Sequence, residues 1–216
     1  MISVENLCKS FGDLEILKGI TENIEKGEKV VIIGPSGSGK STFLTLVGGI
    51  TTASNGGIVI NGKNITSMSE KELAKFRLEN IGFVFQAYNL IPEMTAYQNI
   101  ILPLKLAHKK IDKKYLSDIC NKLSISDRLS HLPSELSGGQ QQRVAIARAL
   151  ITKPSILLCD EPTGNLDKKS SEDVLDLLTQ LCADNGCTLI LVTHDKSVAD
   201  RMGRIITISD GEISED

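Results

Sequence analysis

The sequence lacks the features of several common protein classes. No apolar run approaches the ~20 residues that a membrane-spanning helix needs, and no secretory signal opens the chain. Lysine and arginine form no long block, and the formal net charge of the 216 residues is −3, so nothing indicates nucleic acid as a partner. No repeat or low-complexity segment is visible. We therefore expect one core that acts in the cytoplasm and needs other subunits for any work in a membrane.

Paired cysteine motifs are also missing. The chain has five cysteines, an odd number, and no two of them form a Cys-x-x-Cys pair. This usage favours a reducing compartment over a disulfide scaffold. Cys182 and Cys187 could suggest a metal site, but Cys182 extends the apolar stripe of Val174, Leu178 and Leu181 at helical spacing. Core packing is therefore the favoured interpretation of Cys182.

What the chain does contain is a glycine-rich loop between a predicted strand and a predicted helix. Residues 29–33 are apolar and β-branched, as in a buried parallel strand. The loop fits the phosphate-binding pattern G-x-x-x-x-G-K-[ST], and its residues are Gly34, Pro35, Ser36, Gly37, Ser38, Gly39, Lys40, Ser41 and Thr42. Glycines let successive N–H groups converge on phosphate oxygens, and the helix N-terminus adds positive partial charge. We expect Lys40 to reach the β- and γ-phosphates of ATP and the Ser41 hydroxyl to bind Mg²⁺.

Two adjacent acids follow a second buried-strand run at residues 155–159. Open α/β sheets bind their ligands at the carboxyl ends of strands, which is where Asp160 and Glu161 stand. We expect Asp160 to belong to the Mg²⁺ shell, and Glu161 to accept a proton from, or orient, the attacking water. The two acids need not share a role, because side chains alternate along a strand. The alternative for Glu161 is a cap on the turn before Pro162.

A second phosphate-binding segment is predicted at residues 136–140, which read Leu-Ser-Gly-Gly-Gln and which we call the signature segment. Ser137 is a good N-cap residue for a helix that continues to residue 150. Gly138 and Gly139, followed by Gln140, permit close backbone approach, so a phosphate can sit at this helix N-terminus. A single ATP site needs only one phosphate-binding segment for its γ-phosphate. The second segment is useful only if it faces the ATP bound by another molecule. We therefore expect a dimer of this chain.

In this order, the motifs resemble those of the nucleotide-binding subunits of ATP-binding cassette (ABC) transporters, over essentially the whole chain. Residues 160–167, Asp-Glu-Pro-Thr-Gly-Asn-Leu-Asp, are similar to the acid pair and D-loop of that family. The resemblance implies that Asp167 lies across the interface of an ATP-dependent head-to-tail homodimer. It also implies that His194, after a third buried-strand run, is the family's switch histidine.

Two further roles follow from the same resemblance. It implies that Gln86, after the predicted strand 81–85, contacts Mg²⁺ or water and senses the membrane partner. Phe11 falls where the family places an aromatic that stacks on adenine, a contact usually worth about 1 kcal/mol. The alternative for Phe11 is packing in the core.

The resemblance implies an α/β fold with the doubly wound, RecA-like core of P-loop NTPases. Residues 1–30 and 56–65 predict a small antiparallel β region. We expect one ABC ATPase domain over residues 1–216, with 1–86 and 151–216 as catalytic core and 87–150 as an inserted helical subdomain. Part of the segment 87–100 is expected to form an exposed groove for a cytoplasmic helix of the membrane partner. Its large side chains are Tyr88, Leu90, Ile91, Met94 and Tyr97. Core packing is the alternative for any one of them.

Longer stretches at residues 82–92, 133–150 and 162–167 are similar to the branch that contains macrolide-export, lipoprotein-release, cell-division and peptide-antibiotic-resistance ATPases. This predicts an ATPase at the cytoplasmic face of the membrane that powers export or extraction by a separate integral membrane permease. The alternative is a mechanical signalling ATPase that drives a membrane partner without transport. A third hypothesis is a soluble ABC protein of DNA repair or translation. Such proteins usually need a long coiled-coil insert or two cassettes, which 216 residues cannot hold.

Overall fold

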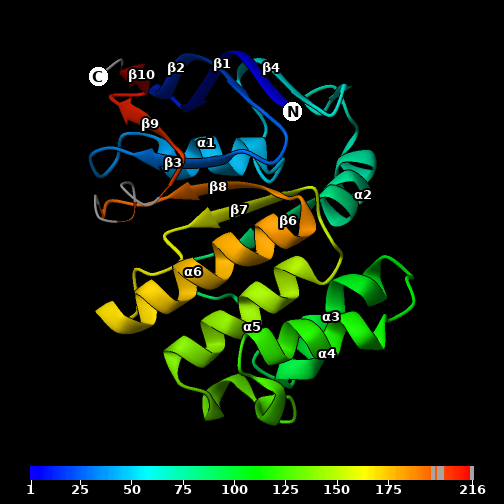
Figure 1. Ribbon diagram of the computed structural model, residues 1–216. Coiled ribbons are helices and arrows are strands. Elements are labelled where there is room, and N and C mark those ends of the chain that lie inside the picture. Colours follow the sequence, from blue (N-terminus) through cyan, green and yellow to red (C-terminus); the bar gives the residue numbers. More distant parts are fainter. Residues whose placement is uncertain (196–197, 199–201, 215–216) are drawn as a thin grey trace.

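The computed structural model describes residues 1–195, 198 and 202–214, and its centre is a six-stranded sheet (Figure 1). The strand order is β10-β9-β3-β8-β7-β6, and all neighbours pair in parallel except β9 and β10. The strands are β3 (Lys29–Ile33), β6 (Ile81–Val84), β7 (Ile156–Asp160), β8 (Thr188–Val192), β9 (Arg204–Ser209) and β10 (Glu212–Ser214). Every residue of β8 is buried, as expected for a strand covered on both faces.

A second, antiparallel sheet lies above the first in Figure 1, in the order β2-β1-β4-β5. Its strands are β1 (Ile2–Phe11), β2 (Leu14–Ile24), β4 (Asn55–Ile60) and β5 (Lys63–Asn64). A tight turn joins the first two strands, where Phe11 pairs with Leu14 and Gly12 takes a left-handed φ of 59°. The predicted antiparallel β region is thus confirmed.

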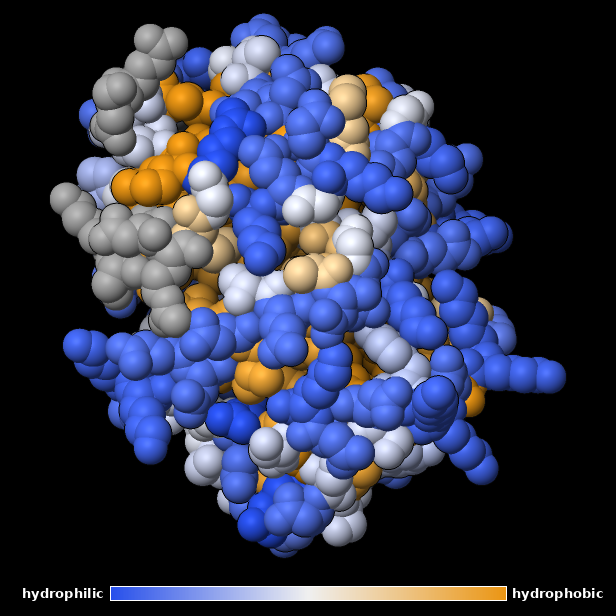
Figure 2. Space-filling view, viewed as in Figure 1, coloured by the Kyte–Doolittle hydropathy of each residue, from blue (hydrophilic) through white to orange (hydrophobic). Residues whose placement is uncertain are grey.

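Helices cover both faces of the six-stranded sheet. They are α1 (Lys40–Val47), α2 (Glu70–Asn80), α3 (Ala96–Leu106), α4 (Lys113–Lys122), α5 (Gly138–Leu150) and α6 (Lys168–Asn185). Figure 1 shows α1 between the two sheets and α5 and α6 on the opposite face, with α3 and α4 beyond them. Most of the viewed surface is hydrophilic (Figure 2). No helix of the described residues is long and apolar enough to cross a membrane.

The alternation of side chains along the strands divides the core into two clusters. Val30 and Ile32 pack with α1 and the antiparallel sheet, whereas Val31 packs with α3 to α6. The predicted burial of Cys182 is confirmed, because its side chain is inside the second cluster. Residues 87–150 hold α3, α4, α5 and two short 3₁₀ turns, but α5 shares its cluster with the sheet. Their division into a separate subdomain stays a prediction.

Local sequence sets where the helices begin. Ser69, Thr95 and Ser137 each cap a helix in a reciprocal capping box with Glu72, Gln98 and Gln140. Asp112 and Asp167 cap α4 and α6 through bonds to backbone N–H groups. At the other end of α5, Gly82 lets the helix pack closely on β6, because a Cβ there would collide with the carbonyl oxygen of Ala149.

Candidate active site

The phosphate-loop motif lies between β3 and the first turn of α1. Gly39 precedes Lys40 with a φ of 102°, a conformation that favours glycine. Gly34, at the end of β3, has a φ of 147°, and a Cβ there would collide with the carbonyl oxygen of Ile208 in β9. The sheet and the turn therefore both require glycine, and the backbone N–H groups of the loop lie at the start of a helix.

Lys40 and Ser38 fit a phosphate group at this loop. Lys40 is only 7% exposed, and its Nζ donates to the carbonyl oxygens of Gly34 and Pro35 at 2.9 and 2.6 Å. The buried Ser38 Oγ has no hydrogen-bond partner among the described residues. A buried cation bound only to carbonyl oxygens, beside an unpaired hydroxyl, has donors to spare for phosphate oxygens.

Ser41 and Asp160 meet across the sheet edge, where Ser41 Oγ donates to Asp160 Oδ1 at 2.9 Å. Burial raises the pKa of Asp160, the Ser41 bond opposes that shift, the Glu161 charge adds to it and the Lys40 charge opposes it. The described residues contain no group of three or more His, Cys, Asp or Glu that could hold a metal by itself. Hydroxyl and carboxylate oxygens suit Mg²⁺, which usually binds through one or two protein groups together with substrate phosphates. The pair therefore fits Mg²⁺.

Glu161 turns away from the strand and pairs with His194. It has a φ of 45°, which is left-handed, and its N–H donates to the Val192 carbonyl at 3.0 Å. His194 Nδ1 lies 2.9 Å from Glu161 Oε1, and the side chains are 70% and 22% exposed, respectively. Strain of this kind in a non-glycine residue costs on the order of 1–3 kcal/mol and clusters at functional sites. The change of backbone direction gives Glu161 a position distinct from that of Asp160.

Gln86 joins the same group of side chains. A Cβ on Gly164 would lie 2.8 Å from Gln86 Nε2 and 3.2 Å from Glu161 Oε2, so both side chains approach one point. Asn165 Nδ2 donates to the Gln86 carbonyl at 2.9 Å and fixes the backbone after β6. The structure thus places Gln86, Glu161 and His194 together.

The signature segment lies at the N-terminus of α5. Ser137 is exposed, and its Oγ accepts from the Gln140 N–H at 3.3 Å. Ser137, Gly139 and Gln140 line a separate hollow of about 260 Å³ with Ser170 of α6. The neighbouring Asp167 caps α6, and its bonds from Ser170 lower its pKa.

Phe11 is 55% exposed at the end of β1, with Lys9 Nζ 4.6 Å from the ring centroid. The core-packing alternative for Phe11 is therefore wrong. Its stacking on adenine stays a prediction.

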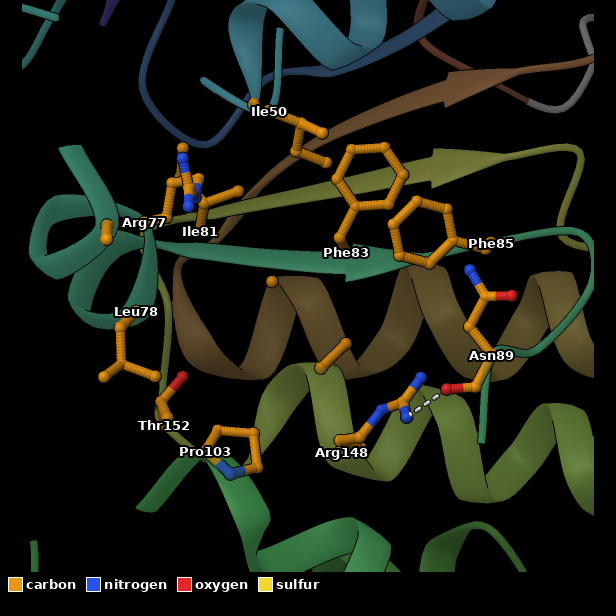
Figure 3. A pocket seen from close by; sticks show the side chains of 14 residues that line it. Ile50, Arg77, Leu78, Ile81, Phe83, Phe85, Asn89, Pro103, Arg148 and Thr152 are labelled. Carbon is orange, nitrogen blue, oxygen red and sulfur yellow. Dashed lines mark hydrogen bonds between the residues drawn. The ribbon is translucent and has the colours of Figure 1, made fainter. Parts of the chain in front are cut away.

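None of Tyr88, Leu90, Ile91, Met94 and Tyr97 lines the apolar groove that the structure shows, and a docking role for segment 87–100 stays a prediction. The structure has an apolar groove of about 420 Å³ between α2, β6 and α5 (Figure 3), but Asn89 is its only lining residue from segment 87–100. Leu90 packs against the core instead, since buried Asn99 binds the backbone of Ile91 and Met94 and holds this segment on the helices. The groove is lined mainly by Ile50, Leu78, Phe83, Phe85, Pro103 and Arg148.

Sequence reasoning also missed Gln142, which is completely buried in α5. Its Nε2 donates to the Pro162 carbonyl at 2.6 Å, which links the signature helix to the turn after β7. A signal was present, because Gln142 stands at helical spacing with the apolar residues Ala145 and Ile146.

An α/β sheet with a phosphate loop at the carboxyl end of β3 and an acid pair at the end of β7 defines a P-loop ATPase. The sequence profile of the family described as ABC transporter matches residues 17–164. The chain belongs to this family and is an ATPase of the ATP-binding cassette type.

Similar proteins agree with this assignment. The lipoprotein-releasing system ATP-binding protein LolD of Bacteroides thetaiotaomicron is 44% identical over 218 residues, and both chains are fully covered. The ABC transporter ATP-binding protein YtrE of Bacillus subtilis is 44% identical over 209 residues, which cover 92% of this chain and 90% of YtrE. The macrolide export ATP-binding/permease protein MacB of Bdellovibrio bacteriovorus is 44% identical over the whole chain, which spans only 34% of MacB.

Solved structures match over nearly their full length. Two dimeric structures of the cassette MJ0796, one of them in a post-hydrolysis state bound to ADP and Pi, have TM-scores of 0.92 and 0.91. Their sequences are 41% and 40% identical to this chain, and the matches cover all of this chain and 97% of theirs. The predicted doubly wound fold and the MacB/LolD branch are thereby confirmed.

Proposed function

We propose that this chain hydrolyses ATP in a head-to-tail homodimer and thereby powers a separate membrane permease that exports or extracts a substrate. The observation that carries the proposal is the convergence of Gln86, Glu161 and His194 beside the Ser41–Asp160 pair at the end of the phosphate loop. The names of LolD and MacB, which refer to lipoprotein release and macrolide export, support the direction of transport. The dimer would sit at the cytoplasmic face of the membrane through the permease.

The chain's own groups divide the chemistry among them. Lys40 exchanges its two carbonyl partners for β- and γ-phosphate oxygens, and the loop N–H groups cradle them. Ser41 and Asp160, with Gln86, would hold Mg²⁺, which supplies positive charge to the phosphate oxygens. Glu161 accepts the proton of the attacking water. His194, hydrogen-bonded to Oε1, fixes the carboxylate so that Oε2 faces the water.

The second cradle is completed by another copy of the chain. Ser137 and the N–H groups at Gly138 and Gly139 are accessible at the start of α5, where the helix dipole favours an anion. The γ-phosphate held by one phosphate loop would be bound by the signature segment of the other copy, with Asp167 at the interface and Phe11 on the adenine. ADP lacks that phosphate, so hydrolysis would release the dimer.

The apolar groove of Figure 3 would receive a short helix from a cytoplasmic loop of the permease. Its floor holds the stacked rings of Phe83 and Phe85, whose centroids are 4.1 Å apart. Ile50 is 48% exposed at its edge, so the groove presents an apolar side chain to solvent. Cationic Arg77 and Arg148 also line the groove and would bind an acidic side chain or the C-terminus of a helix.

The catalytic assignment is tested with two variants of the purified protein. Lys40→Ala should abolish ATP binding, because the phosphate-directed charge is lost. Glu161→Gln should bind ATP normally but lose turnover, since an amide cannot act as the base. Light scattering should show that Glu161→Gln dimerises with Mg-ATP and not with Mg-ADP. Near-normal turnover of Glu161→Gln, or a monomer at high protein concentration with ATP, would contradict the proposal.

A further inference from the structure

Gln142 is an unusual choice for the buried face of α5. Its side chain is 0% exposed, Nε2 donates to the Pro162 carbonyl at 2.6 Å, and Oε1 has no partner in the part of the chain that the structure describes. Burying an amide whose oxygen makes no hydrogen bond costs free energy. Nε2 satisfies the buried Pro162 carbonyl, so the unfavourable part of this burial is the unpaired Oε1.

The bond that Gln142 does make fixes the turn that carries Glu161. The turn begins at the sheet, where the Glu161 N–H binds the Val192 carbonyl, and the Gly164 N–H closes it on the Glu161 carbonyl at 3.1 Å. The next carbonyl, that of Pro162, is buried and is bound by Gln142. The strained backbone at Glu161 is thus tied to the sheet on one side and to α5 on the other.

The helix that carries Gln142, α5, begins at the signature segment. Gln142 lies five residues after Ser137, which corresponds to about 7.5 Å along a rigid α-helix. A movement of the helix N-terminus must therefore move the Gln142 amide, and with it the Pro162 peptide. A displacement of about 1 Å at a catalytic group is enough to change turnover by about a hundredfold.

We propose that Gln142 is a positioning residue that couples the two ATP sites of the dimer. When the signature segment of one chain docks on the γ-phosphate held by the other, α5 and Gln142 set the Pro162 peptide. The Glu161 carboxylate of the same chain then points at its own water. This rests on the proposed function, in which Glu161 is the base and the signature segment binds the second phosphate.

Gln142→Met tests the coupling, because methionine keeps the unbranched shape and removes the amide. We expect kcat to fall about tenfold or more, while the KM for ATP stays within about twofold. We expect a Hill coefficient for ATP above one in the unaltered protein and a value close to one in Gln142→Met. In the Glu161→Gln background, ATP-driven dimerisation should be unchanged, which shows that the signature segment still docks.

Tyr115→Phe is the matched control. It removes a hydrogen bond from the Tyr115 hydroxyl to the Leu150 carbonyl at the opposite end of α5, at 3.1 Å, and so lowers stability without touching the Glu161 turn. Its kcat and Hill coefficient should match those of the unaltered protein. Gln142→Leu is a second variant, should the methionine variant fold poorly.

Each outcome decides the matter. Normal kcat and cooperativity in Gln142→Met, or losses equal to those of Tyr115→Phe, overturn the coupling. Failure of both Gln142 variants to fold assigns the residue to stability and also overturns it. Absence of ATP hydrolysis in the unaltered protein would instead defeat the proposed function.

Discussion

Gly164→Ala should separate catalysis from folding in this protein. The φ of Gly164 is not among the positive values, so alanine fits the backbone. Its Cβ, however, would lie 2.8 Å from Gln86 Nε2 and 3.2 Å from Glu161 Oε2, whereas ordinary contact begins near 3.4 Å. The Gln86 amide must therefore retreat by about 0.6 Å and the Glu161 carboxylate by about 0.2 Å. Both atoms are the far ends of flexible side chains, so the cost in folding free energy is small.

The cost in catalysis should be larger. Displacements of this size at a base and at the group beside it reduce turnover by about 10- to 100-fold, which corresponds to about 1.4–2.8 kcal/mol of transition-state stabilisation. The phosphate loop is untouched, so the KM for ATP should change less than about twofold.

Steady-state phosphate release and thermal unfolding of the same preparation measure both effects. Gly57→Ala is the control, since Gly57 has an ordinary φ and no atom of the described residues lies within 4 Å of its Cβ. Unchanged kcat in Gly164→Ala would refute the placement of Gln86 and Glu161 at one catalytic point. A large fall in melting temperature that accompanies the loss of activity would show that the turn is structural.

Three further predictions use other contacts. Gly82→Ala should lower the free energy of unfolding by about 1–3 kcal/mol in urea titration, because the new Cβ meets the Ala149 carbonyl of α5; stability equal to that of the unaltered protein would contradict this packing. Ile50→Glu should fold and hydrolyse ATP normally but lose co-purification with the permease, whereas Leu90→Glu should unfold the protein, and the reverse result would move the docking site. Bonds from Ser69 lower the pKa of Glu72 in the folded protein. The ionised Glu72 side chain therefore stabilises the fold at pH values above the ordinary glutamate pKa of about 4.3, and this stabilisation is lost as the pH falls through the lower pKa of the folded state. The urea midpoints of Glu72→Gln and the unaltered protein should therefore differ at pH 7 and converge once the pH is below the folded pKa of Glu72.

Much of the fold could be predicted because its signals are local. The buried strands β3, β7 and β8 each contain a run of four apolar residues, and β7 ends in the polar residue Asp160. Lys40 is predicted from the phosphate-loop pattern, and Asp160 and Glu161 are predicted because open α/β sheets bind their ligands at the carboxyl ends of strands. The caps at Ser137 and Asp167 are likewise visible in sequence.

What could not be predicted depends on contacts between distant segments. The groove combines Ile50, Leu78, Phe83, Pro103 and Arg148, which come from five separate parts of the chain, and no periodicity links them. Segment 87–100 is held on the core partly by the buried side chain of Asn99, whose role depends on the backbone that it meets. The amide of Gln142 is the same kind of case.

The position of Gln86 explains how the groove and the ATP site could influence one another over a short path. Phe83 and Phe85 line the groove, Val84 between them is buried in the other core cluster, and Gln86 comes next along the chain. Beyond it, Arg148 donates to the carbonyl oxygen of Asn89 at 2.6 Å (Figure 3) and to that of Tyr88 at 2.7 Å. Both Tyr88 and Asn89 have positive φ values.

The backbone around Gln86 is therefore fixed on both sides by groove-lining residues, Phe85 before it and Arg148 after it. A helix that displaced one of these anchors on entering the groove would move the Gln86 side chain relative to Gly164 and Glu161. If ATP favours one position of Gln86, it favours the state of the groove that goes with that position. By linkage, ATP should then change the affinity of the groove for the permease segment by the same factor by which the permease segment changes the affinity for ATP.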